Sequence, residues 1–386
     1  MSQITCGDFI TLSIRDFAQG GYGISDLPDG RTALVDGAIP GETVCAVIED
    51  IKKDYVMCRT AEVPVPSDKR TEPPCPYYHG ELSCGGCSLM HISYHAQLEL
   101  KNNLFSSAIK QVCGDGDIDL LPPAYSADAG YRSRAKFIYS VSGKQAELGF
   151  LKKQSSEAVF IKSCFVCNSK LNTFISLPPL LNKWELENSQ LPCISTDSKV
   201  LYHPSEPDFI TVSSQIAGSR RLWLSNQVFF QSNLLLLPEL IDFIFQSIQG
   251  ERVLDLYSGV GTFSAFLEDR YCVTAVEMNK DCLMLAKRNL HKTKFITSPV
   301  QNLSLKSFSC DTVIVDPPRT GLAPNVPSVI SSLHPETVIY VSCYLPTLIR
   351  DIRKFISLGY APTLARMLDF YPHTPHTETV VLMSRI

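Results

Sequence analysis

A cysteine and a glutamate near the C-terminus have the side chains that covalent catalysis requires. Cys343 follows the apolar run Thr337–Ser342, and Glu378 precedes the last apolar run. A thiolate can add to an electrophilic carbon and a carboxylate can accept a proton, so the pair could act as nucleophile and base. Simpler explanations are a small buried hydrophobe for the cysteine and a solvated carboxylate for the glutamate. His373 and His376 lie nearby, but their spacing suits no standard metal site.

A glycine-containing turn between two apolar runs indicates a cofactor site. The run Arg252–Tyr257 leads into Ser258-Gly259-Val260-Gly261-Thr262-Phe263, and Glu277 ends the next run. Glycines let a backbone approach a ligand closely, and an acid at the end of the second strand accepts hydrogen bonds from ribose hydroxyls. The longer pattern that pyrophosphate favours is absent, whereas S-adenosylmethionine has no phosphate. The turn therefore resembles the first motif of Rossmann-like methyltransferases, although a lone Gly-x-Gly is often only a tight turn.

The elements that must position these residues alternate between strand and helix from residue 226 onward. Four apolar runs suit buried parallel strands, namely 252–257, 272–277, 311–316 and 337–342. Asp316-Pro317-Pro318-Arg319 closes the third run, at the strand end where open sheets bind ligands. In methyltransferases such a motif lines the methyl-acceptor site, although it could also be a proline-capped strand end. We therefore expect a doubly wound α/β domain over residues 226–386.

Two further domains are expected before this one. Residues 1–66 contain short alternating runs separated by glycine turns, which predict a small β-barrel with strands near 9–14, 43–48 and 55–63. A stiff linker with four prolines follows. Residues 67–225 form a predicted central α+β domain, with a helix over 91–112 because apolar residues recur there at helical spacing.

The central domain also carries a cysteine pattern typical of a metal site. Cys75-x8-Cys84-x2-Cys87 is followed at a distance by Cys164, with Cys167 as a near alternative. Four thiolates suit either zinc or an iron–sulfur cluster, and spacing does not choose between them. On base rates, zinc would lead. The chain has 14 cysteines and no recognisable export signal, so metal binding or catalysis explains them better than disulfides.

Bulk composition excludes little beyond a membrane span. The 386 residues are 45% hydrophobic and 19% charged, and no apolar stretch is long enough to cross a bilayer. A cytoplasmic monomer is expected. The net charge of −4 argues weakly against nucleic-acid binding, but residues 131–170 hold eight Lys or Arg and only two Glu. A local basic face is what contacts phosphate, so charge alone favours neither the presence nor the absence of nucleic-acid binding.

Taken together, the motifs resemble the RNA uracil-5-methyltransferase family. The matching runs are Tyr340-Val341-Ser342-Cys343, Asp316-Pro317-Pro318-Arg319, Pro372-His373-Thr374-x-His376-x-Glu378 and Val228-Phe229-Phe230-Gln231-Ser232-Asn233. The resemblance implies that Cys343 is the nucleophile and Glu378 the proton acceptor. Thiolate addition to C6 of uracil would make C5 nucleophilic toward the methyl sulfonium of S-adenosylmethionine. Cofactor contacts are implied at Gln231, Tyr257, Thr262, Glu277, Asn302 and Asp316, of which Asn302 depends only on a short run.

The rest of the chain resembles the branch of this family that carries a [4Fe-4S] cluster. Cys84-Gly85-Gly86-Cys87 looks like its C-G-G-C run, and Gly149-Phe150-Leu151-Lys152 leads, as in that branch, to the fourth ligand, Cys164. The resemblance thus implies a cluster on Cys75, Cys84, Cys87 and Cys164. Residues 1–66 resemble a TRAM domain, an RNA-binding barrel. Tyr131-Arg132-Ser133-Arg134-Ala135 resembles a motif of the branch whose guanidinium groups would suit phosphate.

This combination points to 23S ribosomal RNA as substrate rather than transfer RNA. The implied activity is methylation of C5 of a flipped uridine, U1939-type or alternatively U747-type. Three departures from the family pattern are Tyr344-Leu345-Pro346 after the nucleophile, a longer first cysteine spacing, and Thr262 where an amide is common.

Several other functions remain open. The activity could be tRNA uracil-C5 or RNA cytosine-C5 methylation, or methylation of an exocyclic amine, which needs no thiol. Another alternative is a non-catalytic RNA-binding or redox-sensing iron–sulfur protein, but this leaves Cys343 and Glu378 unexplained.

Overall fold

The chain folds into two compact units, each built from separate stretches of sequence. The computed structural model describes residues 4–80, 83–114, 118–142, 145–181, 190–203, 206–303 and 308–386. The first unit comprises Met1–Leu104, Leu151–Val159 and Tyr371–His376; the second comprises Phe105–Phe150, Phe160–Phe370 and Thr377–Ile386. Among the described residues, no helix combines the length and the apolar character needed to cross a membrane.

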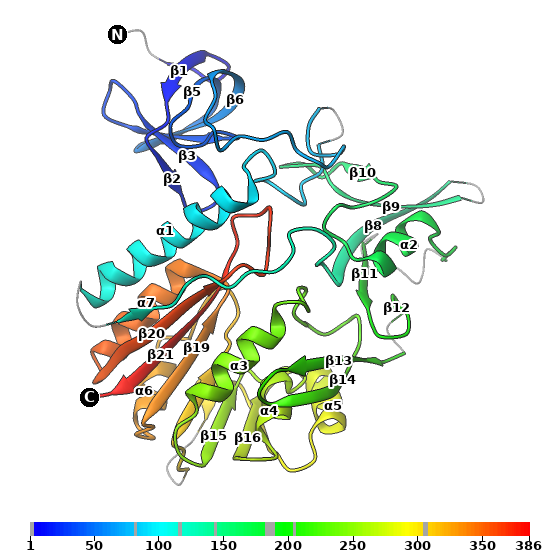
Figure 1. Ribbon diagram of the computed structural model, residues 1–386, viewed down its shortest axis with the longest axis vertical. Helices are drawn as coiled ribbons and strands as arrows, with labels where there is room; N and C mark the ends of the chain where they lie inside the picture. The colour runs from blue at the N-terminus through cyan, green and yellow to red at the C-terminus, as the bar shows by residue number, and fades with distance from the viewer. Residues whose placement is uncertain are drawn as a thin grey trace. The chain divides into compact units, whose positions relative to one another are not determined.

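A six-stranded sheet in the order β1-β5-β6-β4-β3-β2 dominates the first unit (Figure 1). Its strands are β1 (Phe9–Ser13), β2 (Asp16–Ala18), β3 (Tyr22–Asp26), β4 (Thr32–Asp36), β5 (Thr43–Ile51) and β6 (Tyr55–Val65). Along β4 and the first part of β5 every second residue is buried, as the alternating sequence predicts. Three of these strands match the three runs expected from the sequence.

The predicted helix in the middle of the chain is present as α1 (Tyr94–Cys113). It begins three residues later than expected, because the Leu89 carbonyl accepts a turn hydrogen bond from the Ile92 N–H. The Ser93 carbonyl accepts the first helical hydrogen bond, from the N–H of Gln97, at 3.0 Å. The helix passes from the first unit into the second between Leu104 and Phe105.

Two smaller sheets are formed by strands between residues 134 and 224. One has the order β10-β9-β8-β11-β12, and the other is the hairpin β13-β14. Their strands are β8 (Arg134–Ser142), β9 (Gln145–Leu151), β10 (Ala158–Phe160), β11 (Gln190–Ser195), β12 (Val200–Leu201), β13 (Asp208–Ser214) and β14 (Gly218–Leu224). A short helix, α2 (Ser169–Ser176), is capped by the Asn168 side chain, which accepts from the Leu171 N–H.

An eight-stranded sheet in the order β17-β16-β15-β18-β19-β21-β20-β7 forms the core of the second unit (Figure 1). The strands are β7 (Asp119–Leu120), β15 (Arg252–Leu256), β16 (Cys272–Glu277), β17 (Lys294–Thr297), β18 (Thr312–Val315), β19 (Thr337–Ser342), β20 (Tyr360–Leu368) and β21 (Glu378–Arg385). β15 to β19 pair in parallel, whereas β21 runs antiparallel to β19 and β20. The four predicted strands are all present, and the expected doubly wound α/β arrangement is confirmed.

Helices between the strands cover this sheet. They are α3 (Leu237–Ser247), α4 (Thr262–Leu267), α5 (Lys280–Asn289), α6 (Val326–Ser331) and α7 (Leu345–Ile356), with a short 3-10 turn, η3 (Val300–Asn302). α7 buries an apolar stripe that includes Leu348, Ile352 and Phe355, while Arg353 and Lys354 lie in its last turn. Pro346 lies in its first turn, where a missing N–H costs no helical hydrogen bond.

Candidate active site

Four predicted site residues lie at the carboxyl ends of neighbouring parallel strands. Tyr257 follows β15, Glu277 ends β16, Asp316 follows β18, and Cys343 follows β19. Because these strands are parallel and adjacent, their carboxyl ends share one edge of the sheet. β15 lies between β16 and β18, so the strand order reverses there, and open α/β sheets bind ligands at such a switch point.

Glu378 reaches the same edge through the antiparallel strand β21. Thr379 pairs with Ser342, so the next step along the two strands places Glu378 beside Cys343. The Glu378 side chain is 1% exposed, and its Oε1 has no hydrogen-bond partner among the described residues. Sheet topology thus brings together the predicted nucleophile and the predicted proton acceptor, which lie 35 positions apart in the sequence.

Burial raises the pKa of three carboxyl groups in this region. The pKa of Asp255 rises to about 7, although its Oδ2 accepts a hydrogen bond from the Ser264 hydroxyl at 2.6 Å. Burial and the neighbouring Asp255 raise the pKa of Asp316 to about 7. Burial, and then Asp316, raise the pKa of Glu378 well above its ordinary value, while Arg319 opposes the shift. Carboxyl groups crowded in this way hold protons near neutral pH and can exchange them with a substrate.

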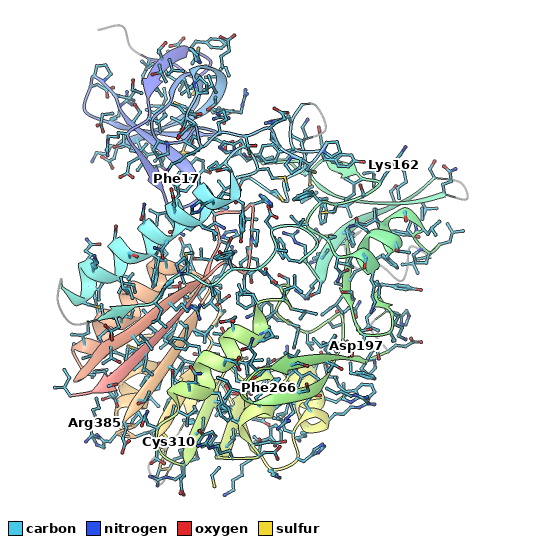
Figure 2. All side chains as sticks on the ribbon, viewed as in Figure 1. Phe17, Lys162, Asp197, Phe266, Cys310 and Arg385 are labelled. Atoms are coloured by element: carbon cyan, nitrogen blue, oxygen red, sulfur yellow. The ribbon has the colours of Figure 1, made fainter. Side chains whose placement is uncertain are left out.

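The Cys343 thiol is half-buried, unlike the cysteines of the hydrophobic core. Burial, followed by the charges of Glu378 and Asp316, raises its pKa to about 11, and Arg319 acts in the opposite direction. Cys310, labelled in Figure 2, is instead 3% exposed within the core of the second unit. A thiol with a raised pKa must pass its proton to an acceptor before it reacts at neutral pH. Glu378 and Asp316 are the carboxylates whose charges act on it.

The two glycines of the turn after β15 have different tasks. Gly261 has a φ of +82° and is the N-cap residue of α4, and a Cβ there would lie 2.6 Å from Leu290 Cδ1. Gly259 has a φ of +57°, and a Cβ there would meet nothing within 4 Å. Gly259 therefore leaves open space beside its backbone, whereas Gly261 allows close packing of the helix. Tyr257 also adopts a left-handed conformation, with a φ of +62°.

Glu277 is held in place by the backbone of this turn. Its Oε2 accepts from the Gly259 N–H at 2.9 Å, and its Oε1 accepts from the N–H groups of Met278 and Asn279 at 2.8 and 2.7 Å. A carboxylate has about four acceptor positions, so one remains for a hydroxyl.

The remaining predicted contacts differ in burial. Gln231 is 6% exposed, and its Oε1 has no hydrogen-bond partner within the part of the chain that the structure describes. Next to it, the Ser232 carbonyl accepts from the N–H and hydroxyl of Ser133 at 2.7 and 2.9 Å. The Y-R-x-R and F-x-Q-x-N runs are therefore neighbours in space. Thr262 begins α4, and Asn302 is exposed at the end of η3.

Comparison with known proteins decides the family. A 23S rRNA (uracil(1939)-C(5))-methyltransferase of Vibrio parahaemolyticus is 30% identical, and the match covers 95% of this chain and 93% of that protein. The chain belongs to the RNA uracil-C5-methyltransferase family. An RNA methyltransferase of Thermotoga maritima is 29% identical over 96% of this chain and 98% of its own length. The family and the enzyme class predicted from the sequence are thus confirmed.

Two other comparisons agree with this family. The family model described as tRNA (Uracil-5-)-methyltransferase matches residues 292–386, which include Asp316, Cys343 and Glu378. The Pyrococcus abyssi tRNA (uracil-54, C5)-methyltransferase, solved in complex with S-adenosyl-L-homocysteine, has the same fold. It aligns with a TM-score of 0.72 and 22% identity, over 97% of this chain and 99% of that one.

The predicted metal ligands are divided between the two units. Cys75, Cys84 and Cys87 belong to the first unit, and Cys164 belongs to the second. Within the described residues, no group of three or more His, Cys, Asp or Glu side chains is arranged to hold a metal ion. The Cys164 thiolate accepts a hydrogen bond from Cys167, the alternative ligand, which is only 1% exposed. The cluster and its ligands stay a prediction.

The terminal family motif divides at the same boundary. His373 belongs to the first unit, where its N–H donates to Gln97 Oε1 at 3.0 Å. Its carbonyl accepts from the N–H groups of Ser88 and Leu89, at 2.9 and 3.0 Å. Glu378 belongs to the second unit. The residues before Glu378 therefore anchor a loop within the first unit.

The sequence motifs predict no role for two charged residues of this family site. Arg319 only ends the Asp-Pro-Pro-Arg run, yet its charge acts on both Cys343 and Glu378. Asp255 only lies within the run before the glycine turn, yet it is buried and acts on Asp316. The sequence signal for Arg319 and Asp255 is that each lies within one of the family motifs. Their effects depend on contacts across the sheet that spacing does not reveal.

Proposed function

We propose that this protein methylates C5 of a uridine in 23S ribosomal RNA, with Cys343 as nucleophile and Glu378 as proton acceptor. The observation that carries the proposal is the position of Glu378, at the start of β21, beside Cys343, at the carboxyl end of β19. Uracil C5 is a weak nucleophile, so methylation needs a thiolate that adds to C6 and a base that later removes the C5 proton. The edge supplies both groups, together with carboxyls whose raised pKa values suit proton exchange.

S-adenosylmethionine is the proposed methyl donor, held by Gln231, Tyr257, Thr262, Glu277, Asn302 and Asp316. Bound there, it would supply a methyl group on a positively charged sulfur. The residues present fit this molecule, since Glu277 keeps an acceptor position for a ribose hydroxyl and Gly259 leaves space beside the backbone. The Gln231 Oε1, buried and without a partner among the described residues, could accept from a ligand donor.

In the proposed reaction, Cys343 loses its proton to the Asp316 carboxylate and its sulfur bonds to C6 of the uracil, so that the electron pair of the C5–C6 double bond moves into an enolate. C5 then takes the methyl group from the sulfonium of the donor, and neutral S-adenosylhomocysteine is the leaving group. Glu378 removes the C5 proton, and the bond between sulfur and C6 breaks, which restores the thiolate and the double bond of the base. The uridine must leave its stack to reach this edge, at a cost of a few kcal/mol that RNA contacts would offset.

The substrate assignment comes from the relatives. The relative from Vibrio parahaemolyticus is named for uridine 1939 of 23S rRNA, and so is one from Pseudomonas putida at 28% identity. We therefore propose the corresponding 23S uridine as the target. Transfer RNA is the second candidate, because the matching family model is described by a tRNA activity. Methylation of 23S fragments and of tRNA, mapped by mass spectrometry, distinguishes the two.

A trapping experiment tests the mechanism. A 5-fluorouridine-containing 23S fragment cannot lose a proton from C5, so incubation with S-adenosylmethionine should leave a covalent protein–RNA adduct. Cys343→Ala should give neither adduct nor methylation. Cys310→Ala removes a thiol of the core and should still give the adduct. Normal methylation by Cys343→Ala would contradict the proposal and favour chemistry that needs no thiol.

We also propose that the three-domain division holds, with 1–66 as a TRAM-like RNA-binding module, 67–225 as the cluster domain and 226–386 as the methyltransferase domain. Cys75, Cys84, Cys87 and Cys164 would hold a [4Fe-4S] cluster, which would stabilise the central domain or shape the RNA site. The Gly86 N–H donates to Cys84 Sγ at 3.3 Å, a contact of the kind that clusters receive. Anaerobically purified protein should be brown and contain iron. Stoichiometric zinc would contradict this part.

A further inference from the structure

Hydrogen bonds from the first turns of α7 hold the loop that follows β18. Thr347 Oγ1 donates to the Arg319 carbonyl at 3.1 Å. Arg350 Nη2 donates to the carbonyls of Thr320 and Leu322, at 3.1 and 3.0 Å. Three carbonyls of this short loop are therefore tied to side chains of one helix.

Asp351 forms the buried centre of this network. Its side chain is 5% exposed, and its Oδ2 accepts from the Leu322 N–H at 2.9 Å and from the Tyr340 hydroxyl at 2.7 Å. Its Oδ1 accepts from Arg350 Nε at 2.8 Å. Tyr340 lies on β19, three residues before Cys343. One carboxylate thus ties both the loop and the strand of the nucleophile to α7.

The packing of Gly321 shows how closely loop and helix meet. Its φ is +73°, and a Cβ there would lie 2.5 Å from Arg350 Nη2 and 2.7 Å from Asp351 Oδ2. Because those distances are too short for any side chain, the loop can approach the helix only with glycine at this position.

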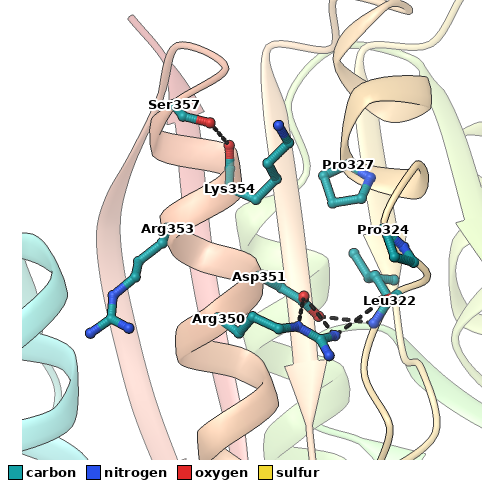
Figure 3. Close-up of a pocket in the computed structure, with 8 residues that line it drawn as sticks. All are labelled: Leu322, Pro324, Pro327, Arg350, Asp351, Arg353, Lys354 and Ser357. Atoms are coloured by element: carbon teal, nitrogen blue, oxygen red, sulfur yellow. Dashed lines mark hydrogen bonds and ion pairs between the residues drawn. The ribbon is translucent and has the colours of Figure 1, made fainter.

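The outer side of the network borders an open pocket of about 560 Å³, lined by Leu322, Pro324, Pro327 and the polar face of α7 (Figure 3). The Arg350 side chain is 54% exposed there, in contrast to Asp351. An exposed ion pair contributes little, whereas removal of a buried acceptor leaves its donors unsatisfied. Asp351 should therefore matter more than Arg350.

We propose that α7 acts as a clamp that holds the loop after β18, which carries Arg319, against the strand that leads to Cys343. The clamp residues are Thr347, Arg350 and Asp351, with Asp351 at the centre. They are positioning residues, because they act through Arg319. The inference rests on the proposed function, in which the thiol must ionise next to carboxylates. The groups whose charges act on the thiol are Glu378 from β21, and Asp316 and Arg319 from the loop after β18.

Loss of the clamp should make the thiol harder to ionise. Without Asp351, the N–H of Leu322 and the hydroxyl of Tyr340 lose their acceptor, and the loop carrying Arg319 loosens. The positive charge then spends less time near the sulfur, while the carboxylates remain. Small misplacements of catalytic groups can lower rates by up to about 100-fold, so kcat should fall about 10- to 100-fold. The KM for RNA should change little, because the RNA contacts elsewhere are unchanged.

Alkylation of Cys343 by iodoacetamide in the full chain tests the clamp without RNA or turnover. At pH 8 the rate follows the thiolate fraction, and peptide mass spectrometry assigns it to this cysteine. We expect Asp351→Asn to slow it about 3- to 10-fold, and Arg319→Gln to slow it similarly. The double variant should be no slower than Arg319→Gln alone, because Asp351 acts through Arg319. Thr347→Val, which removes the hydroxyl that donates to the carbonyls of Arg319 and Tyr344, is a milder variant that should show a smaller effect of the same sign.

Asp311→Asn is the matched control, because Asp311 also binds an arginine and backbone N–H groups, but at the start of β18. It should leave the alkylation rate unchanged. The clamp would be overturned if Asp351→Asn slowed alkylation of Cys343 equally in the wild-type and the Arg319→Gln backgrounds. It would also be overturned if Asp351→Asn and Thr347→Val both folded and alkylated at the wild-type rate. Covalent trapping of fluorinated RNA by the wild type is a separate result, so the clamp can fail while the proposed function stands.

Discussion

The two ends of β18 carry aspartates in opposite environments. Asp311, just before the strand, accepts from the N–H groups of Glu251 and Arg252, each at 2.9 Å, and pairs with the Arg252 guanidinium. These contacts lower its pKa to about 2. Asp316, just after the strand, has its pKa raised to about 7 by burial and by Asp255. The same residue type thus stays ionised at one end and holds a proton near neutral pH at the other.

This difference separates a structural carboxylate from a functional one. Asp311 holds the start of β15 against the start of β18, and its negative charge is balanced there by Arg252 and backbone N–H groups. The charged neighbour that acts on Asp316 is Asp255, and those that act on Glu378 are Asp316 and the opposing Arg319. A fold gains no stability from such crowding, which is typical of sites that exchange protons with a ligand. Four predictions test this contrast.

Glu378→Gln should have the largest effect, because an amide cannot accept the C5 proton. Turnover should fall about 10²- to 10⁴-fold, the usual contribution of a general base. The thiol can still add and C5 can still be methylated, so a covalent adduct should persist on ordinary RNA. Denaturing gel electrophoresis after incubation with 23S RNA and S-adenosylmethionine measures it. Asp311→Asn should turn over normally. Free, methylated RNA released at the wild-type rate by Glu378→Gln would rule out its role as proton acceptor.

Asp316→Asn should change the reactivity of Cys343 in a pH-dependent way. Above the Asp316 pKa of about 7 its negative charge raises the pKa of the thiol, and below it the neutral carboxyl does not. At pH 8.5 the variant should therefore alkylate Cys343 faster than the wild type, by about 10-fold for each pKa unit of the thiol. At pH 5.5 the two rates should converge. A constant ratio of the variant to the wild-type alkylation rate between pH 5.5 and pH 8.5 would contradict the titration of Asp316 near pH 7.

The sequence was enough to predict four of the eight strands of the main sheet and the residues that follow them. Buried parallel strands leave long apolar runs, and the residue after each run must lie at a strand end, so the runs alone were enough to place Cys343 and Asp316. Glu378 was placed beside them only through family resemblance. The antiparallel course of β21 is what brings it there, and no local pattern shows which strand will be its neighbour.

Charge effects and the loop contacts of α7 could not be predicted in this way. Asp351 lies on an amphipathic helix whose sequence shows only a polar position, yet the side chain is buried and accepts from Tyr340 and Leu322. Likewise, the Asp-Pro-Pro-Arg run marks Asp316 as a site residue, but it does not show that the pKa of Asp316 differs from that of Asp311. Their pKa values depend on which donors or carboxylates the tertiary fold places next to them.

Asp311→Asn should lower stability while leaving catalysis intact. Two backbone N–H groups and a guanidinium would lose a charged acceptor, at a cost of about 1–3 kcal/mol in the free energy of unfolding. The lowered pKa determines how this contribution to stability changes with pH. The contribution of Asp311 is present above the unfolded value of roughly 3.9 and is lost as pH falls toward about 2. Urea unfolding at pH 7 and pH 3 should show the deficit shrinking at the lower pH.

Asp316→Asn should change stability in the direction opposite to Asp311→Asn. Because the folded pKa of about 7 exceeds the unfolded value of roughly 3.9, ionisation favours the unfolded chain. The penalty is absent below about pH 4, grows between pH 4 and 7, and is complete above. Removal of the charge should therefore stabilise the protein at pH 8 by at most about 4 kcal/mol, since the shift spans about three pKa units and each unit is worth roughly 1.4 kcal/mol. Near pH 4 the variant and the wild type should unfold at the same urea concentration. If Asp316→Asn lowered stability at pH 8 as Asp311→Asn does, the two ends of β18 would not differ in the way described, and Asp316 would be a structural carboxylate too.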